Sequence, residues 1–322
     1  MLSLVIGSAS LVWTLSHDIS RQSISLSLLF SVTFVGLCQP ILFFSKARDE
    51  IAALSGEAAT TAAGIERYCT ERQLRRMTTI TWFTRVFFMA YFVVASGVVI
   101  TYGLLPLYRA KLAPELPFLP ENSAFFWALY FLQTSIFTAG PLSVSSMICY
   151  HFEMSLCISF MFRLTAEHFQ AASCPRDVES AIGNHQRLLE TSRLFVNLFA
   201  LSWFNLFALT TAVLIISTCV MITVSFEVIL LLMLFTAGAA LFMLCFWGEL
   251  VTLASESVGF SVYNSDWVSG LFHLRKELAL VILKSNRPVC VVAGFFGSLG
   301  MPKFYTAGKT WYKFVQAVLN LQ

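Results

Sequence analysis

The chain has 322 residues, of which 57% are hydrophobic and only 12% are charged. Soluble globular domains carry about 25% charged residues, so much of this chain need not face water and an ordinary soluble domain is disfavoured. The formal net charge of +3 gives no support to nucleic-acid binding. The eight cysteines show no CxxC or Cys/His spacing, so we expect small packed side chains and neither a metal site nor a cofactor.

Seven apolar stretches are candidate membrane spans, since a bilayer-crossing helix needs about 20 mostly apolar residues. In chain order they are 2–15, 24–44, 80–105, 123–162, 194–220, 226–247 and 289–321. The fourth is too long for one crossing, so its end should project into the cytosol. The seventh is the weakest, because Gly297, Gly300 and Pro302 interrupt it. The pattern predicts an all-α membrane protein with seven transmembrane helices.

The first stretch is short and starts directly after Met1. A signal peptide is an alternative, but the stretch lacks a basic start and a clean small-x-small cleavage site. We expect a true, short first span, and an incomplete N-terminus stays open.

Basic residues mark alternate connecting segments. Segments 45–79, 163–193 and 248–288 together hold fourteen lysines and arginines, whereas the other connections hold three. The positive-inside rule puts the fourteen in the cytosol, so the N-terminus is expected inside and the C-terminus outside. This orientation, and the missing NPxxY and DRY signatures, argue against a G-protein-coupled receptor.

The composition of the connecting segments predicts their local structure. Segment 45–79 predicts a cytoplasmic helix with a break near Gly64, and segment 163–193 predicts an amphipathic helix in which His185 is a surface side chain. The outer segment 106–122 carries four prolines, which favour a stiff, extended lid over an outward-facing cavity.

The seventh stretch carries polar side chains that a helix facing only lipid would not carry. A charge at mid-bilayer costs roughly 3 kcal/mol or more, so such groups usually face a cavity or a water path. They are Lys303, Lys309, Lys313, Gln316 and Asn320. We expect one wet face on this helix.

The last third of the chain resembles the C-terminal signature of insect odorant receptors. Weaker likeness covers CFWGELVTLASES, the NHQRLLE segment and RLTAEHF. The matching residues of the signature are Tyr263, Ser265 and Trp267, then Ser285, Arg287 and Pro288, then Ala293, Gly294, Phe296 and Phe304, and last Lys309, Thr310 and Tyr312.

The resemblance implies three regions. Residues 1–247 would form the bundle of spans one to six with cytoplasmic extensions, 248–288 a cytoplasmic anchor helix, and 289–322 a pore-lining transmembrane helix. Tyr263 and Trp267 would lie one turn apart on the anchor helix and pack between subunits. Proline disfavours helix at the residue before it, so Arg287-Pro288 should end that helix.

The resemblance also implies a function. Members are odorant-gated, non-selective cation channels, and this chain lacks the long insertion between spans four and five of the family's co-receptor. It therefore looks like the odour-tuned subunit of a heterotetramer with that co-receptor, in the plasma membrane of sensory-neuron dendrites.

Alignment with the family puts a hydrophobic gate at Ala317 and Leu321. Ala317 is small where a larger aliphatic side chain is common, and Lys313 lies on the same face. Four copies of Lys313 would repel cations, whereas one copy among four subunits is tolerable. We expect this chain to need the co-receptor for most of its pore.

Family precedent puts small volatile ligands in the outer half of the bundle, in an apolar and aromatic pocket with few polar groups. Ser96 and Thr134 would offer hydroxyls, although such groups also bond back to their own helix. The candidates are Phe30, Thr33 and Phe34 on the second span, Phe92, Ser96, Val99 and Gly103 on the third, Tyr130, Thr134 and Phe137 on the fourth, and Leu230 and Met233 on the sixth.

Other functions fit less well. A gustatory receptor-type channel of the same superfamily is the nearest alternative, but its TY-x5-QF motif fails because Trp311 follows Thr310 and Gln316 comes one residue early. A transporter would show internal repeats, which are not found. His151, Glu153 and Glu249 are the one set that suggests an intramembrane enzyme, but helix ends near the interface explain them better, and we expect no catalytic residues.

Overall fold

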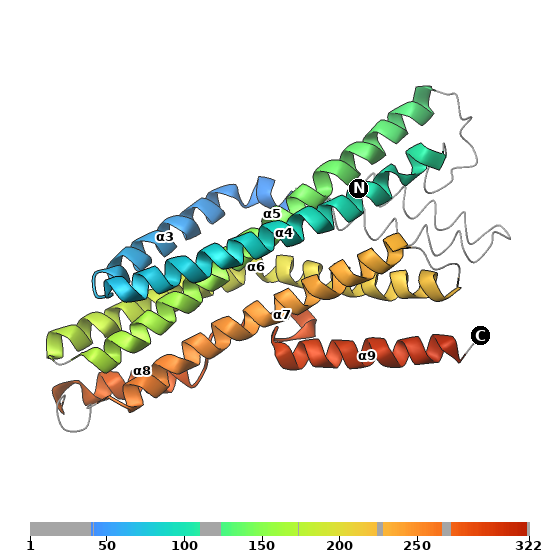
Figure 1. The fold of residues 1–322 in the computed structure, drawn as a ribbon. Helices are drawn as coiled ribbons and strands as arrows, with labels where there is room; N and C mark the ends of the chain where they lie inside the picture. The colour runs from blue at the N-terminus through green and yellow to red at the C-terminus, as the bar shows by residue number, and fades with distance from the viewer. Residues whose placement is uncertain are drawn as a thin grey trace.

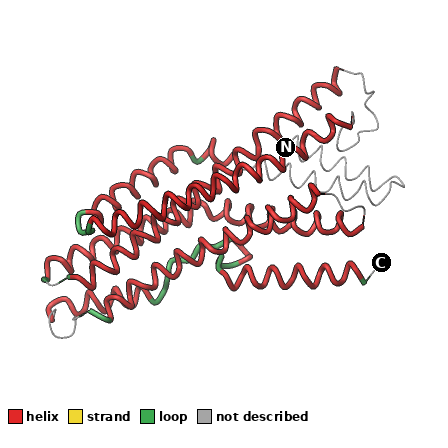
Figure 2. Tube along the Cα trace, in the orientation of Figure 1, coloured by secondary structure: helices red, strands yellow, loops and turns green. Residues whose placement is uncertain are grey.

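The described part of the chain is helical along almost its whole length (Figures 1 and 2). The computed structural model describes the backbone of residue 40 and of residues 42–109, 124–172, 174–223, 228–265 and 272–320. Within these ranges the one extended pairing is an antiparallel bridge between Val292 and Ser298. The elements are α3 (Arg48–Glu66), α4 (Glu71–Arg109), α5 (Ala124–Ala171), α6 (Pro175–Thr223), α7 (Val228–Tyr263), η1 (Phe272–Leu274), α8 (Arg275–Ser285), η2 (Gly294–Phe296) and α9 (Met301–Leu319).

Helices α4 to α7 are apolar enough and long enough to cross a membrane. Each coincides with one of the predicted spans three to six, apart from residues 123, 226 and 227, which are not described, and spans one and two lie almost entirely outside the described residues. α5 has 48 residues and α6 has 49. At 1.5 Å per residue each is about 70 Å long, more than twice the roughly 30 Å of a hydrocarbon core. Both therefore extend well beyond a bilayer, as expected for the fourth stretch.

The long helices run side by side, and α3 and α8 pack against their projecting ends (Figure 1). These ends share a continuous apolar core that includes Leu54 of α3, Phe169 of α5, Leu188 of α6 and Val258 of α7. The helix predicted in 163–193 is the first part of α6 and continues unbroken into the fifth stretch. The expectation for His185 was wrong: it is 2% exposed, because α6 packs on α3 and α5 along this part.

The helix break in segment 45–79 lies later than predicted. α3 runs through Gly64 and ends at Glu66. The chain restarts at a reciprocal cap, in which Thr70 N–H donates to Gln73 Oε1 at 2.7 Å and Gln73 N–H donates to Thr70 Oγ1 at 3.4 Å. This T-x-x-Q capping box satisfies two backbone donors and fixes the start of α4. It was readable in the sequence, whereas a single glycine does not end a helix.

α7 continues straight through residues 247 and 248, where the sequence suggested a boundary between regions. Residues 248–288, predicted as a cytoplasmic anchor helix, comprise the last part of α7, a connection and the separate helix α8. α8 and the chain after it pack on small residues of α7. A Cβ at Gly259 would lie 2.7 Å from Ser285 Cβ, and Ser255 Oγ accepts a hydrogen bond from Val289 N–H at 2.9 Å.

The seventh stretch is α-helical only from Met301, not from residue 289 as expected, and the one helical turn before it is the short 3-10 helix η2. The residues before it form a compact loop that closes with Leu299 N–H donating to Val291 C=O at 2.8 Å. Gly294 and Gly297 adopt φ of 52° and 82°, which side chains with a Cβ rarely adopt. Pro302 lies in the first turn of α9, where a backbone N–H is not needed. The last helix is thus split, as predicted, into α8 and α9.

Candidate functional site

A cavity of about 110 Å³, open to the outside of the described bundle, lies between α4, α5, α6 and α7. Its wall is mostly aliphatic, and Met233 and Ala237 of α7 close one side. The hydroxyl-bearing side chains on the wall are Tyr91, Ser96, Ser145, Thr210 and Thr236. A cavity of this character suits a small apolar molecule with one polar group.

One hydroxyl on this wall is both fully buried and without a hydrogen-bond partner among the described residues. Tyr91 OH donates to Thr236 C=O at 3.1 Å, and Thr210 Oγ1 donates to Leu206 C=O at 2.8 Å. Thr236 Oγ1 donates to Met233 C=O at 3.0 Å. Ser96 Oγ is buried and has no hydrogen-bond partner among the described residues. A buried, unpaired hydroxyl costs free energy, so Ser96 is the wall residue best placed to bond a ligand.

Two of the twelve residues proposed for the odour pocket, Ser96 and Met233, line this cavity. Leu230 is buried one turn from Met233 and Phe92 is half-buried, and neither is on the described wall. For Val99, Gly103, Tyr130, Thr134 and Phe137 the structure describes only the backbone, and Phe30, Thr33 and Phe34 lie outside the described residues. The sequence did not single out the contribution of α6, because Leu206, Leu209, Thr210 and Val213 look like any apolar helix face.

α9 lies along the edge of the molecule beside α6 and α7 (Figure 1). Its inner face is apolar and is made by Phe304, Ala307, Trp311 and Val318, which are all half-buried. None of its residues is fully buried. The outer face is exposed, and Lys309, Lys313, Gln316 and Ala317 recur on it at helical spacing. An exposed polar face is thus present, and that it faces water stays a prediction. Leu321, the second residue of the expected gate, lies outside the described residues.

Two specific contacts hold α9 to the bundle. Trp311 Nε1–H donates a hydrogen bond of 3.0 Å to Thr218 Oγ1 of α6. The rings of Phe304 and Phe242 of α7 meet edge to face with centroids 5.4 Å apart. Thr218 lies on the same helix as Thr210 and Val213 of the cavity wall. α6 therefore contacts both the cavity and α9.

The start of α9 is fixed by a close approach to α7. Glu249 Oε2 accepts a hydrogen bond of 3.2 Å from Met301 N–H, where the helix dipole favours a negative charge. A Cβ at Gly248 would lie 2.4 Å from Leu299 O, so only glycine allows the two backbones to meet here. The same close packing requires glycine at position 300, because a Cβ there would collide with the Glu249 carboxylate.

The trio that might have suggested an enzyme is separated in the structure. His151 is 1% exposed and stacks on Trp203 with ring centroids 4.2 Å apart. Glu153 forms an ion pair with Arg85 of α4 at 2.8 Å, and Glu249 caps α9. Each of the three thus has its own structural role. Within the described residues no group of His, Cys, Asp and Glu could hold a metal ion.

The proposed subunit anchor is only half described. Tyr263 is the last residue of α7 and is 65% exposed, and Trp267 lies outside the described residues. α7 ends at Tyr263 and residues 264 and 265 turn, and the expected helical spacing from Tyr263 to Trp267 falls on residues outside those that the structure describes.

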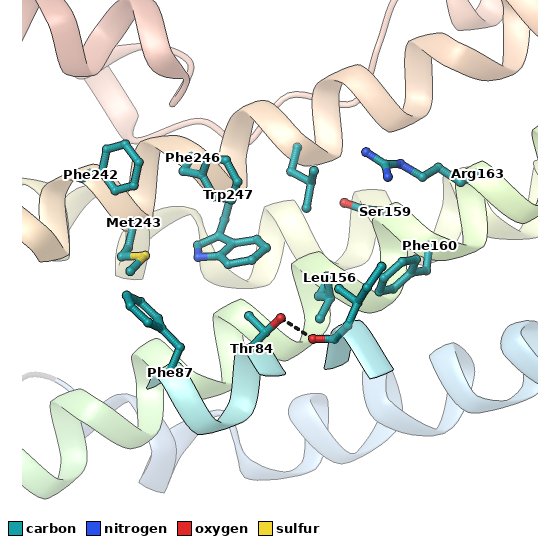
Figure 3. A pocket seen from close by; sticks show the side chains of 12 residues that line it. Thr84, Phe87, Leu156, Ser159, Phe160, Arg163, Phe242, Met243, Phe246 and Trp247 are labelled. Atoms are coloured by element: carbon teal, nitrogen blue, oxygen red, sulfur yellow. Dashed lines mark hydrogen bonds between the residues drawn. The ribbon is translucent and has the colours of Figure 1, made fainter. Parts of the chain in front are cut away.

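A second, larger hollow of about 400 Å³ opens between α4, α5 and α7 (Figure 3). The aromatic side chains of Phe87, Phe160, Phe242, Phe246 and Trp247 lie on its wall, and Arg163 lies at one end. It holds none of the residues proposed for the odour pocket.

The sequence of this chain is similar to those of known proteins. The family model described as "7tm Odorant receptor" matches residues 22–312. Odorant receptor 67a from Drosophila melanogaster is 26% identical over 235 residues, which cover 65% of this chain and 56% of that relative. The match thus spans little more than half of the relative's length.

Two solved structures share the fold. Both are of the insect olfactory receptor OR5 from Machilis hrabei, one of them in complex with eugenol. The complex superposes on all of this chain and 87% of the receptor with a TM-score of 0.82 at 11% identity. The other gives a TM-score of 0.74 at 12% identity, over all of this chain and 88% of the receptor. With the family match over most of its length, this chain belongs to the 7tm odorant receptor family of multi-pass membrane proteins.

Proposed function

We propose that this chain is the odour-tuned subunit of a heteromeric, odorant-gated, non-selective cation channel in the plasma membrane of a sensory-neuron dendrite. The partner would be the co-receptor of the family, and the N-terminus would face the cytosol. The observation that carries the proposal is the apolar cavity with its unpaired Ser96 hydroxyl. A small volatile molecule with one polar group matches that wall.

The contacts of α6 support coupling between the cavity and a pore. α6 carries Thr210 of the cavity wall and, two turns further along, Thr218, which bonds Trp311 of α9. A ligand that changes the packing of α6 would therefore change how α9 packs against α6. Because packed helices shift between discrete arrangements, such a change can be passed on to a gate.

Lys313 supports a heteromer over a homomer. It is exposed on the polar face of α9, one turn from Ala317. Four such lysines around one axis would raise a positive barrier to cations. A single copy among subunits that lack the lysine would lower that barrier, which is why the co-receptor is expected to supply most of the pore.

A cavity-filling variant tests the ligand site. Ala237→Phe should occupy the cavity and abolish odorant-evoked current in cells that also express the co-receptor, at unchanged surface expression. Leu232→Phe is the matched control, because Leu232 is 41% exposed on the same helix and is not on the cavity wall. Full responses in the Ala237→Phe variant would rule out this cavity as the odorant site.

A further inference from the structure

We propose that the groove between α4, α5 and α7 binds an anionic phospholipid of the cytoplasmic leaflet, with the phosphate at Arg163 and an acyl chain along the aromatic wall (Figure 3). The assignment rests on the proposed orientation of the chain, which puts this end of the groove at the cytosolic side. It concerns a site separate from the odorant cavity.

Of the four polar side chains in the groove, two are donors without an acceptor among the described residues. The hydroxyls of Thr84 and Ser159 already donate a hydrogen bond to a carbonyl of their own helix, so neither is free to donate to a ligand. Trp247 is 7% exposed and its Nε1–H has no partner among the described residues. Arg163 is exposed and makes no ion pair with a described residue. A matching ligand must bring an anion for the guanidinium and an acceptor for the indole.

The order of these groups along the groove gives the shape of the ligand. In Figure 3, Arg163 is at one end, Phe87, Phe242 and Met243 are at the other, and Trp247 lies between. Arg163 is seven residues beyond Leu156 on α5, which is about 10 Å along the helix. The groove thus runs from a positive charge past one N–H donor to a fully apolar end.

A phospholipid presents its groups in the same order. Its phosphate lies at the interface, its ester carbonyls lie just below and can accept from Trp247, and its chains continue into the apolar region. A free fatty acid has a polar group at one end only and would leave Trp247 unpaired. A neutral odorant would leave Arg163 without an anion.

The surroundings favour lipid as well. Phe87 is 55% exposed and Phe242 and Phe246 are each 37% exposed, so the wall of the groove is open at its side. α4, which forms that side, buries only 11% of its apolar window within the described bundle. Basic side chains that follow an apolar surface attract anionic headgroups, and Arg76 lies one turn from Ile80 of the groove.

The test is native mass spectrometry of the purified full chain, titrated with phosphatidylserine, phosphatidylcholine or oleate. Phosphatidylserine should bind about tenfold more weakly to Arg163→Gln, through loss of a charge-assisted contact. It should bind roughly threefold to tenfold more weakly to Trp247→Phe, which keeps the ring and removes the donor. Arg193→Gln, at an exposed arginine outside the groove, should bind as the unchanged chain does.

Equal binding of phosphatidylserine by the unchanged chain and by both groove variants would overturn the proposal. Oleate binding that is as tight, depends on Arg163 and ignores Trp247 would overturn it in favour of a free fatty acid. If Arg163→Gln is not monodisperse, Trp247→Phe and Arg163→Lys, which should retain most of the binding, carry the test. The readout needs no odorant and no current, so a failed channel proposal would leave this result standing.

Discussion

Ser96 shows what a single residue contributes in this bundle. Most hydroxyls in the described helices donate to a carbonyl one turn back, as Thr210 does, and so add little polarity to a cavity. Ser96 is buried without such a bond. The sequence identified both Ser96 and Thr134 as possible hydroxyl donors, but only packing decides which hydroxyl stays unpaired. That decision cannot be read from residue type.

The first prediction concerns this hydroxyl. Ser96→Ala should raise the half-maximal concentration of odorants that carry an oxygen by about tenfold, since one buried hydrogen bond is lost. Hydrocarbon odorants of the same shape should act as before. Thr210→Val is the control, because that hydroxyl is already bonded to its own helix. Dose–response currents measure both, and an equal loss for hydrocarbons would show that Ser96 acts through packing alone.

At the scale of elements, the sequence predicted helices better than their ends. Long apolar runs located α4 to α7, because the hydropathy of 20 residues outweighs any single position. The ends of the helices depend on local contacts. The Thr70–Gln73 capping box fixes the start of α4, so the break between α3 and α4 lies after Gly64, and α7 continues through residue 248 without a break. The small residues of α7 against which α8 and the loop before α9 pack could not be recognised in the sequence, because glycine and serine are common in apolar helices.

The close approach of α7 and the loop before α9 gives the second prediction. Gly248→Val should lower the free energy of unfolding by about 2 kcal/mol and displace the start of α9, because its Cβ would lie 2.4 Å from Leu299 O. Gly56→Ala is the control: nothing lies within 4 Å of that Cβ, and the helix should gain up to about 1 kcal/mol. Thermal unfolding of the purified chain separates the two. A Gly248→Val chain as stable as Gly56→Ala would contradict the packing.

The third prediction concerns the contact between α6 and α9. Trp311→Phe and Thr218→Val each remove one partner of a 3.0 Å hydrogen bond. If the bond holds α9 against α6, each single variant should shift the odorant response in the same direction. The double variant should then add little, with a coupling of about 1 kcal/mol. Half-maximal concentrations in a double-mutant cycle measure it, and full additivity would mean that the contact is incidental.

At the scale of the whole molecule, the two parts of the long helices make different contacts. Their projecting parts share an apolar core with α3 and α8, whereas the membrane parts leave α4 and the outer face of α9 uncovered within the described bundle. A polar face on the last helix was predictable, because lysines at helical spacing do not face lipid. In the proposed heteromer, the neighbouring subunits and the water of the pore would cover that face.

The most direct test of the central claim is whole-cell current in response to a panel of volatiles, from cells expressing this chain alone and with the co-receptor. We expect odorant-gated cation current only with the co-receptor, because under the proposal Lys313 would obstruct a pore made of four identical chains. Lys313→Ala expressed alone should then show a larger basal cation current than the unchanged chain. Robust odorant-gated cation current from the unchanged chain alone would contradict the account.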